Sequence, residues 1–157
     1  MTIRRLYWDL NCFLAYLRGE SGRLELCRDV LREAERGNVR IVTSALTLAE
    51  VLNLRGHEPL PKQIRKTVTD FLKHDYIVVR NVTTRVAELA RDLVWDQSVK
   101  PKDAIHVATD LDAKVPMLNT FDDGLKSKNG RIGSPALVIV EPQPPAQRDL
   151  DLPKGRW

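Results

Sequence analysis

The sequence has few of the features that replace or supplement an ordinary hydrophobic core. It contains two cysteines, Cys12 and Cys27, in 157 residues, and they form neither a CxxC pair nor a disulfide framework. No run approaches the roughly 18–20 apolar residues that a membrane-spanning helix needs, and the first residues lack the apolar segment of a secretory signal. We therefore expect two reduced thiols, no membrane association and a cytoplasmic location.

The composition is that of an ordinary globular protein. Hydrophobic residues make up 43% of the chain and charged residues 29%, which disfavours long disordered regions, collagen-like structure and a coiled-coil rod. A chain of 157 residues is near the size of one domain and buries enough surface for a core without metal or disulfide supports. We expect one domain over residues 1–141, followed by a Pro-rich, extended tail over residues 142–157.

Short apolar runs alternate with segments of helical periodicity along the chain. The pattern predicts strands at residues 3–8, 39–43, 76–82, 115–119 and 136–140. It predicts helices at residues 11–17, 24–35, 44–54, 62–73, 86–94 and 103–113. This alternation is typical of parallel βαβ units with helices on both faces of a sheet, so the expected fold class is α/β.

Four acidic residues occupy corresponding positions in these units. Asp9 directly follows the first strand, and Glu50 lies on the helix that leaves the second. Asp103 opens a later helix, and Asp122 follows the strand at 115–119, with Asp123 beside it as an alternative fourth acid. Functional groups of an open parallel sheet gather beyond the carboxyl ends of its strands, so we expect these side chains to meet there.

Carboxylates that lie close together repel one another unless a cation lies between them. Oxygen ligands without cysteine or paired histidine select a hard ion, so the expected cofactor is Mg²⁺ or Mn²⁺. Such an ion would activate water and neutralise phosphate charge at a phosphodiester.

Local structural roles remain open for each of these acids. Asp103 is a suitable helix N-cap, Glu50 stands three residues after Thr47 as in a capping box, and Asp9 suits a turn. Asn11 and Thr120 are interpreted as supporting residues or as turn formers, and His106 as a structural histidine.

The charge balance favours a polyanionic partner. The formal net charge is +4, although the four expected site residues belong to the 21 acids that oppose 25 Lys and Arg. Two basic groups are candidates for phosphate contacts, with a solvated surface as the alternative for each. The residues singled out for substrate binding are Arg55, Lys62, Lys66, Lys126 and Lys128.

The order of these motifs resembles the PIN-domain nucleases, above all the VapC-type toxins of prokaryotic toxin–antitoxin pairs. The resemblance rests on Asp9-x-Asn11, Glu50, the segment Asp103-Ala-x-His-x-Ala and Thr120-x-Asp122. It implies a three-layer α/β/α sandwich with a central, mostly parallel sheet of about five strands. It also implies Mg²⁺- or Mn²⁺-dependent cleavage of RNA at the four acids, a homodimer, and an antitoxin that covers the active site.

Two other functions remain as alternatives. One is a catalytically weak or inactive module that binds RNA or a partner on the same fold. The other is an aspartyl-phosphate phosphatase with Asp9 as the covalent nucleophile, although such enzymes usually have a second acid where Asn11 stands.

Overall fold

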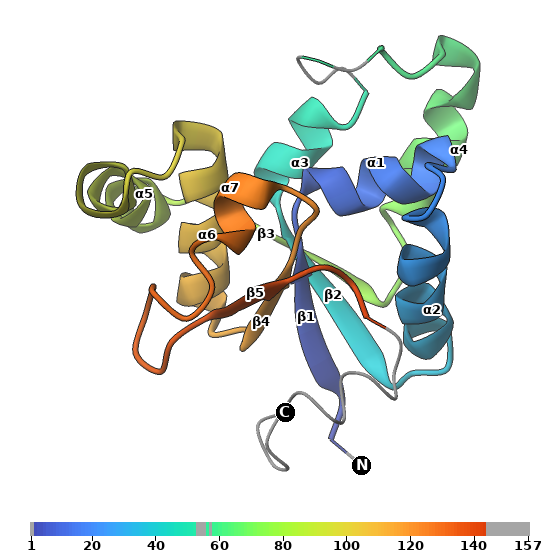
Figure 1. Ribbon diagram of the computed structural model, residues 1–157. Helices are drawn as coiled ribbons and strands as arrows, with labels where there is room; N and C mark the ends of the chain where they lie inside the picture. The colour runs from blue at the N-terminus through green and yellow to red at the C-terminus, as the bar shows by residue number, and fades with distance from the viewer. Residues whose placement is uncertain (1, 53–55, 57, 144–157) are drawn as a thin grey trace.

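The computed structural model describes residues 2–52, 56 and 58–143 and shows a five-stranded sheet with helices on both faces (Figure 1). The strands are β1 (Arg4–Trp8), β2 (Val39–Ser44), β3 (Ile77–Arg80), β4 (Met117–Asn119) and β5 (Val138–Val140). Their order across the sheet is β3-β2-β1-β4-β5, and every neighbouring pair is parallel. The expected α/β class with a parallel sheet of five strands is confirmed.

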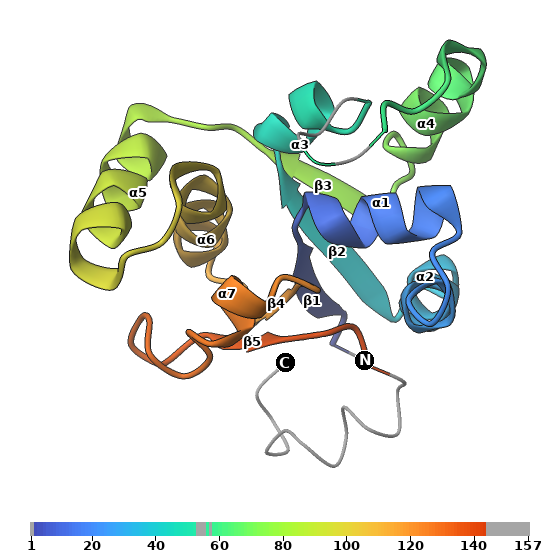
Figure 2. The same ribbon diagram turned by 45° about the horizontal axis from the view of Figure 1, so that its top comes forward.

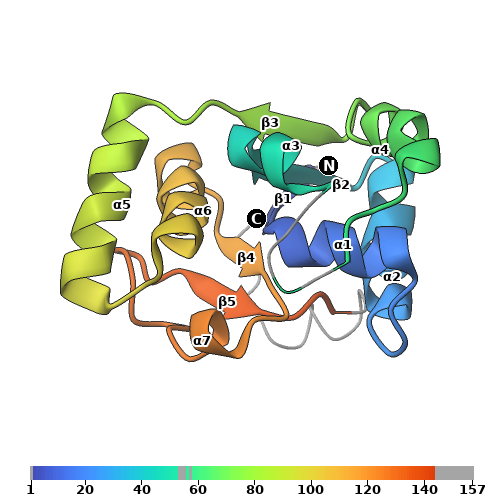
Figure 3. The ribbon, with the colours of Figure 1, turned by 90° about the horizontal axis from the view of Figure 1, so that it is seen from above.

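Seven α-helices and one short 3₁₀ helix lie in the described part of the chain. They are α1 (Leu10–Arg18), α2 (Leu24–Glu35), α3 (Ala45–Glu50), η1 (Lys62–Ile64), α4 (Arg65–Phe71), α5 (Thr84–Gln97), α6 (Pro101–Ala113) and α7 (Asp123–Lys126). Seen from above, α1, α2 and α4 lie on one side of the sheet and α5 and α6 on the other (Figure 3). This arrangement is the expected α/β/α sandwich.

The sheet separates two apolar cores. Leu6 and Trp8 of β1 point into the core formed with α1, α2 and α4, whereas Tyr7 between them points into the core formed with α5 and α6. Such alternation follows from the strand geometry, in which successive side chains leave opposite faces. Because β1 is central and buried on both sides, its carboxyl end is held firmly in the middle of the molecule.

Several helices differ from the sequence-based expectation, and the helix predicted at 62–73 is divided into η1 and α4. The predicted helix at 44–54 ends at Glu50, and residues 53–55 lie outside the described residues. The four-residue helix α7 was not predicted, because an element this short has no room for a periodic apolar pattern. Most of the expected tail, residues 144–157, is also outside the described residues, so the boundary at residue 141 stays a prediction.

None of the helices in the described part of the chain combines the length and apolar character that crossing a membrane requires.

Candidate active site

The carboxyl ends of the strands carry the acidic residues to one edge of the sheet. Asp9 follows β1, and α3, which ends in Glu50, follows β2. Asp122 lies shortly after β4, and Asp103 is in the first turn of α6. When the top of the molecule is turned forward, α3, α1, α7 and the upper end of α6 surround this edge (Figure 2).

Asp9 is buried and held by two hydrogen bonds. Its Oδ1 accepts from the backbone N–H of Cys12 at 3.2 Å, which makes Asp9 the N-cap of α1. Its Oδ2 accepts from the Thr120 hydroxyl at 2.5 Å. Burial raises the pKa of Asp9, and Asp122 adds to that rise, while the Thr120 hydrogen bond opposes it. The carboxylate is therefore fixed in place at some electrostatic cost.

Thr120 also connects Asp9 to the fourth acid. Its Oγ1 accepts from the backbone N–H of Asp122 at 3.0 Å, and Asp122 Oδ2 in turn accepts from the N–H of Leu125 at 2.8 Å. Asp122 is thus the N-cap of α7. One hydroxyl therefore sets the position of both Asp9 and the chain that bears Asp122.

The charges of both of these acids act on Asp103. Burial first, and then the negative charges of Asp122 and Asp9, raise its pKa to about 6. Its expected alternative role as a helix N-cap is wrong, because α6 begins at Pro101 and Lys100 occupies the cap position. Repulsion among close carboxylates is the reason why the sequence predicts a bound cation.

Glu50 faces α6 rather than the three aspartates. Its Oε2 lies 3.3 Å from Lys102 Nζ, and its Oε1 lies 3.5 Å from His106 Nε2. Burial alone would raise the pKa of Glu50, but His106 and Lys102 together lower it. The capping box with Thr47 is not formed, because α3 begins at Ala45 with Ser44 as its N-cap.

A cavity of about 440 Å³ brings Asp9, Glu50 and Asp103 to one opening. Its other lining residues are Leu10, Asn11, Lys100, Pro101, Lys102 and His106. A smaller hollow of about 130 Å³ adjoins it, because Asp103 and Lys100 line both; Asp122 and Lys128 line the second. The four predicted acids therefore lie around two neighbouring hollows.

The donor set suits a hard divalent cation in its chemistry. All four acids offer oxygen, and the buried Glu50 Oε1 has no hydrogen-bond partner among the described residues. In the observed conformation, no three His, Cys, Asp or Glu side chains of residues 2–52, 56 and 58–143 are grouped closely enough to hold one ion. Glu50 in particular is turned toward Lys102 and His106.

Of the remaining predicted site residues, some lie at the site and others lie outside it. Asn11 lines the larger cavity, and Thr120 binds Asp9, so both lie where a supporting role needs them. The Asp123 side chain is 98% exposed and pairs with Lys126, outside both hollows. Of the two adjacent acids, Asp122 is the one placed at the site.

The predicted phosphate-binding residues are mostly elsewhere. Lys128 lines the smaller hollow. Lys126 pairs with Asp123 and Glu141, Lys66 pairs with Asp70, and Lys62 lies in η1; none of the three lines either hollow. Arg55 lies outside the described residues.

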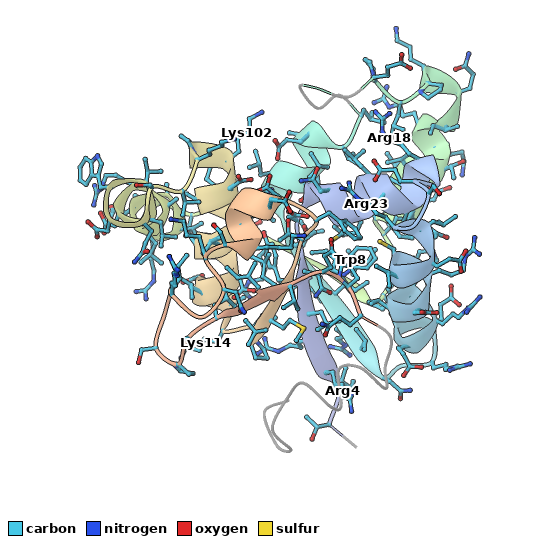
Figure 4. The ribbon with its side chains drawn as sticks, viewed as in Figure 1. Arg4, Trp8, Arg18, Arg23, Lys102 and Lys114 are labelled. Atoms are coloured by element: carbon cyan, nitrogen blue, oxygen red, sulfur yellow. The ribbon has the colours of Figure 1, made fainter. Side chains whose placement is uncertain are left out.

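Two cationic residues at the cavity were missed. Lys100 and Lys102 flank Pro101 directly before Asp103, and both line the cavity opening. In Figure 4, Lys102 lies at the upper end of α6 beside α3, whereas Lys114 marks the opposite end of that helix. Their closeness in sequence to Asp103 was the available signal, since the first turn of a helix carries its neighbours to the same site.

Comparisons with known proteins agree with this architecture. A search of curated proteins found no match. Among solved structures, Mycobacterium tuberculosis VapC20, described as a sarcin-ricin loop cleaving toxin, is similar with 17% identity and a TM-score of 0.58, over 75% of this chain and 90% of that chain. A chain of a toxin–antitoxin complex from Klebsiella pneumoniae is similar with 19% identity and a TM-score of 0.56, over 88% of this chain and 98% of that chain.

At these identities the solved structures show a shared fold. The family model of the PIN domain matches residues 6–131, which is most of the chain and includes all four acids. The resemblance seen in the motifs is thereby confirmed, and the protein belongs to the PIN-domain family.

Proposed function

We propose that this protein is a metal-dependent endoribonuclease that hydrolyses RNA phosphodiester bonds, and that it is the toxin of a toxin–antitoxin pair. The observation that carries the proposal is the group of Asp9, Asp103 and Asp122 around two adjoining hollows, where burial and the charges of Asp122 and Asp9 raise the pKa of Asp103. A protein that keeps three mutually repelling carboxylates around adjoining hollows needs a compensating cation or must protonate one of them.

In this proposal the site residues have two functions, metal binding and phosphate binding. Asp9, Glu50, Asp103 and Asp122 would hold Mg²⁺ or Mn²⁺, which supplies Lewis-acid stabilisation of charge at the scissile phosphate. Lys100 and Lys102 stand at the opening of the same cavity, where they meet the phosphates of an RNA strand. The hydrogen bond from Thr120 orients Asp9 and opposes the rise in its pKa that burial causes.

The proposal extends to the partners and the cellular setting. One of the similar structures is a toxin–antitoxin complex, which supports a cognate antitoxin for this chain. We also propose a homodimer, a cytoplasmic location, and a nuclease unit formed by residues 1–141.

The direct test is RNA cleavage with a matched set of variants. Purified protein is incubated with labelled single-stranded RNA and Mn²⁺, with and without EDTA. We expect cleavage that EDTA abolishes and that Asp9→Asn and Asp122→Asn both lose, because each removes a charge at nearly constant volume.

Asp123→Asn is the matched control, since it removes the neighbouring exposed charge and should leave cleavage unchanged. RNA that stays intact with the wild-type protein and Mn²⁺ would favour a non-catalytic binding module instead. Expression of the wild type in bacteria should arrest growth, and expression of Asp9→Asn should not.

A further inference from the structure

A buried chain of three polar side chains crosses from the sheet to Glu50. Tyr7 of β1, His106 of α6 and Glu50 of α3 are 0%, 3% and 7% exposed. The Tyr7 hydroxyl lies 2.8 Å from His106 Nδ1, and the two rings pack edge to face with centroids 5.9 Å apart. The other ring nitrogen, Nε2, points to Glu50 Oε1 at 3.5 Å.

The surrounding residues that the structure describes offer no hydrogen-bond partner to His106 Nε2 or to Glu50 Oε1, so these two atoms face each other. Both Nε2 of His106 and Oε1 of Glu50 are buried, and neither has a hydrogen-bond partner among the described residues; their 3.5 Å contact is an ion-pair distance. A nitrogen lone pair facing a carboxylate oxygen would be repulsive, so Nε2 must carry a hydrogen. The Tyr7 hydroxyl then fits as donor to Nδ1, because burial raises the pKa of Tyr7 well above its usual value and keeps the hydroxyl protonated.

Glu50 needs such a contact more than the other acids do. It is the last residue of a helix of six, and its side chain has three rotatable bonds whose ordering costs conformational entropy. Its second partner, Lys102, is 64% exposed in its side chain, and an ion pair on such an exposed lysine holds a geometry weakly. Asp9 and Asp122, by contrast, are fixed by backbone N–H groups.

We propose that His106, itself fixed by Tyr7, is a positioning residue that orders the Glu50 carboxylate at the cavity it shares with Asp9 and Asp103. This inference rests on the proposed nuclease function. His106 was expected to be a structural histidine, and its buried place in α6 agrees with that role. The free Nε2 facing an acid of the site assigns it the additional role.

Two substitutions separate the two ring nitrogens. His106→Gln places an amide nitrogen near the Nε2 position and keeps a donor for Glu50. His106→Asn keeps a polar group only near the Nδ1 position, beside Tyr7. Mn²⁺ binding is measured by titration calorimetry, RNA cleavage is measured in parallel, and thermal unfolding serves as the measure of folding.

We expect His106→Asn to weaken Mn²⁺ binding and cleavage by about 10-fold, which is typical for the loss of a hydrogen-bond partner behind a metal ligand. His106→Gln should stay within about threefold of the wild type. Equal losses in both variants, or none in His106→Asn, would overturn the positioning role while the proposed function stands.

The wild-type protein supplies a second measurement that needs no variant to fold. In a long-range ¹H–¹⁵N correlation spectrum, the His106 signals should show a protonated Nε2, with His106→Gln used to assign them. An unprotonated Nε2 would overturn the inference. A wild type that neither binds Mn²⁺ nor cleaves RNA would instead overturn the proposed function, and this inference with it.

Discussion

Thr120 has more influence on the site than its size suggests. Its hydroxyl donates to the buried carboxylate of Asp9 and accepts from the backbone N–H of Asp122, so one oxygen couples the ends of β1 and β4. A hydrogen bond to a charged group contributes about 1.5–3 kcal/mol, and removing the donor also leaves a buried charge less well satisfied.

Thr120→Val is therefore expected to lower the free energy of unfolding by about 2 kcal/mol and to reduce RNA cleavage by about 10-fold or more. Valine keeps the shape of threonine but has no hydroxyl, so the change is chiefly electrostatic. Chemical denaturation and single-turnover cleavage are the measurements. Thr120→Ser keeps the hydroxyl and should retain most of both properties; a Thr120→Val protein with wild-type cleavage would contradict the role.

The individual acids show why sequence alone leaves their roles open. Asp9 and Asp122 each cap a helix with a carboxylate that also faces the site, so a structural role and the proposed functional role fall on the same group. Asp103 caps nothing, because the helix begins two residues earlier at Pro101. Spacing locates such residues near element ends, but whether a cap is formed depends on the backbone angles there, which the sequence does not determine.

At the scale of elements, α3 and α6 build the cavity together. The short helix α3 carries Glu50 to the first turn of α6, where Lys102 and His106 meet it. A helix of six residues has few internal hydrogen bonds, so its stability depends strongly on its ends. Ser44 supplies the N-cap, with its hydroxyl accepting from the N–H of Leu46 at 3.1 Å.

We expect Ser44→Ala to lower the free energy of unfolding by about 1 kcal/mol and to reduce cleavage several-fold, because α3 loses its cap and Glu50 its fixed position. Thr83→Ala is the matched control. Thr83 caps α5 through Val86, and its loss should cost similar stability without changing cleavage. The role of α3 would be contradicted if both variants cleave RNA equally well.

The order of the elements was predictable because it depends on repeating patterns. Apolar runs and helical periodicity located all five strands and most helices, and parallel βαβ logic then placed Asp9, Glu50 and Asp122 at one edge. What could not be predicted was the direction in which Glu50 points. That direction depends on packing between α3 and α6, elements separated by more than 50 residues, and no local pattern records it.

At the scale of the whole molecule, the site acids are concentrated in one place. The carboxyl edge of the sheet gathers the site acids, although the chain as a whole carries a formal charge of +4. The unfolded chain separates these acids and relieves their repulsion. A cation that binds the folded acids should therefore stabilise the fold.

Addition of Mn²⁺ or Mg²⁺ at about 100 times its dissociation constant should raise the free energy of unfolding by about 2.7 kcal/mol, which is measurable as a higher melting temperature. Asp9→Asn should lose most of this increase. Sodium chloride at equal ionic strength is the control, because screening alone acts on all surface charges. A melting temperature that does not respond to either divalent ion would contradict the acid cluster.

Asp110, an acid outside the site, lies toward the C-terminal end of α6 and affects the stability of the whole molecule. Asp110 is fully buried, and neither carboxylate oxygen has a hydrogen-bond partner among the described residues. Burial raises its pKa well above the usual value, and the charge of Arg5 offsets this only in part. Arg5 is itself occupied with the last carbonyl groups of α6, at Ala113 and Lys114.

The raised pKa makes the stability depend on pH with a defined sign. Below about pH 4, Asp110 is protonated in both the folded and the unfolded chain. Above that pH the unfolded chain releases the proton while the folded chain keeps it, so the stability falls as pH rises toward the folded pKa. Asp110→Asn should therefore be more stable than the wild type at pH 7, by about 1–3 kcal/mol, with a smaller difference near pH 4.

Denaturation of both proteins between pH 4 and pH 8 measures this difference. Asp112→Asn is the matched control on the same helix, because Asp112 pairs with Arg80 and Arg85 and should lose up to about 1 kcal/mol when neutralised. An Asp110→Asn protein that is less stable than the wild type at pH 7 would show that the ionised carboxylate is stabilised in the fold. In that case the charge of Arg5, rather than burial, would control Asp110.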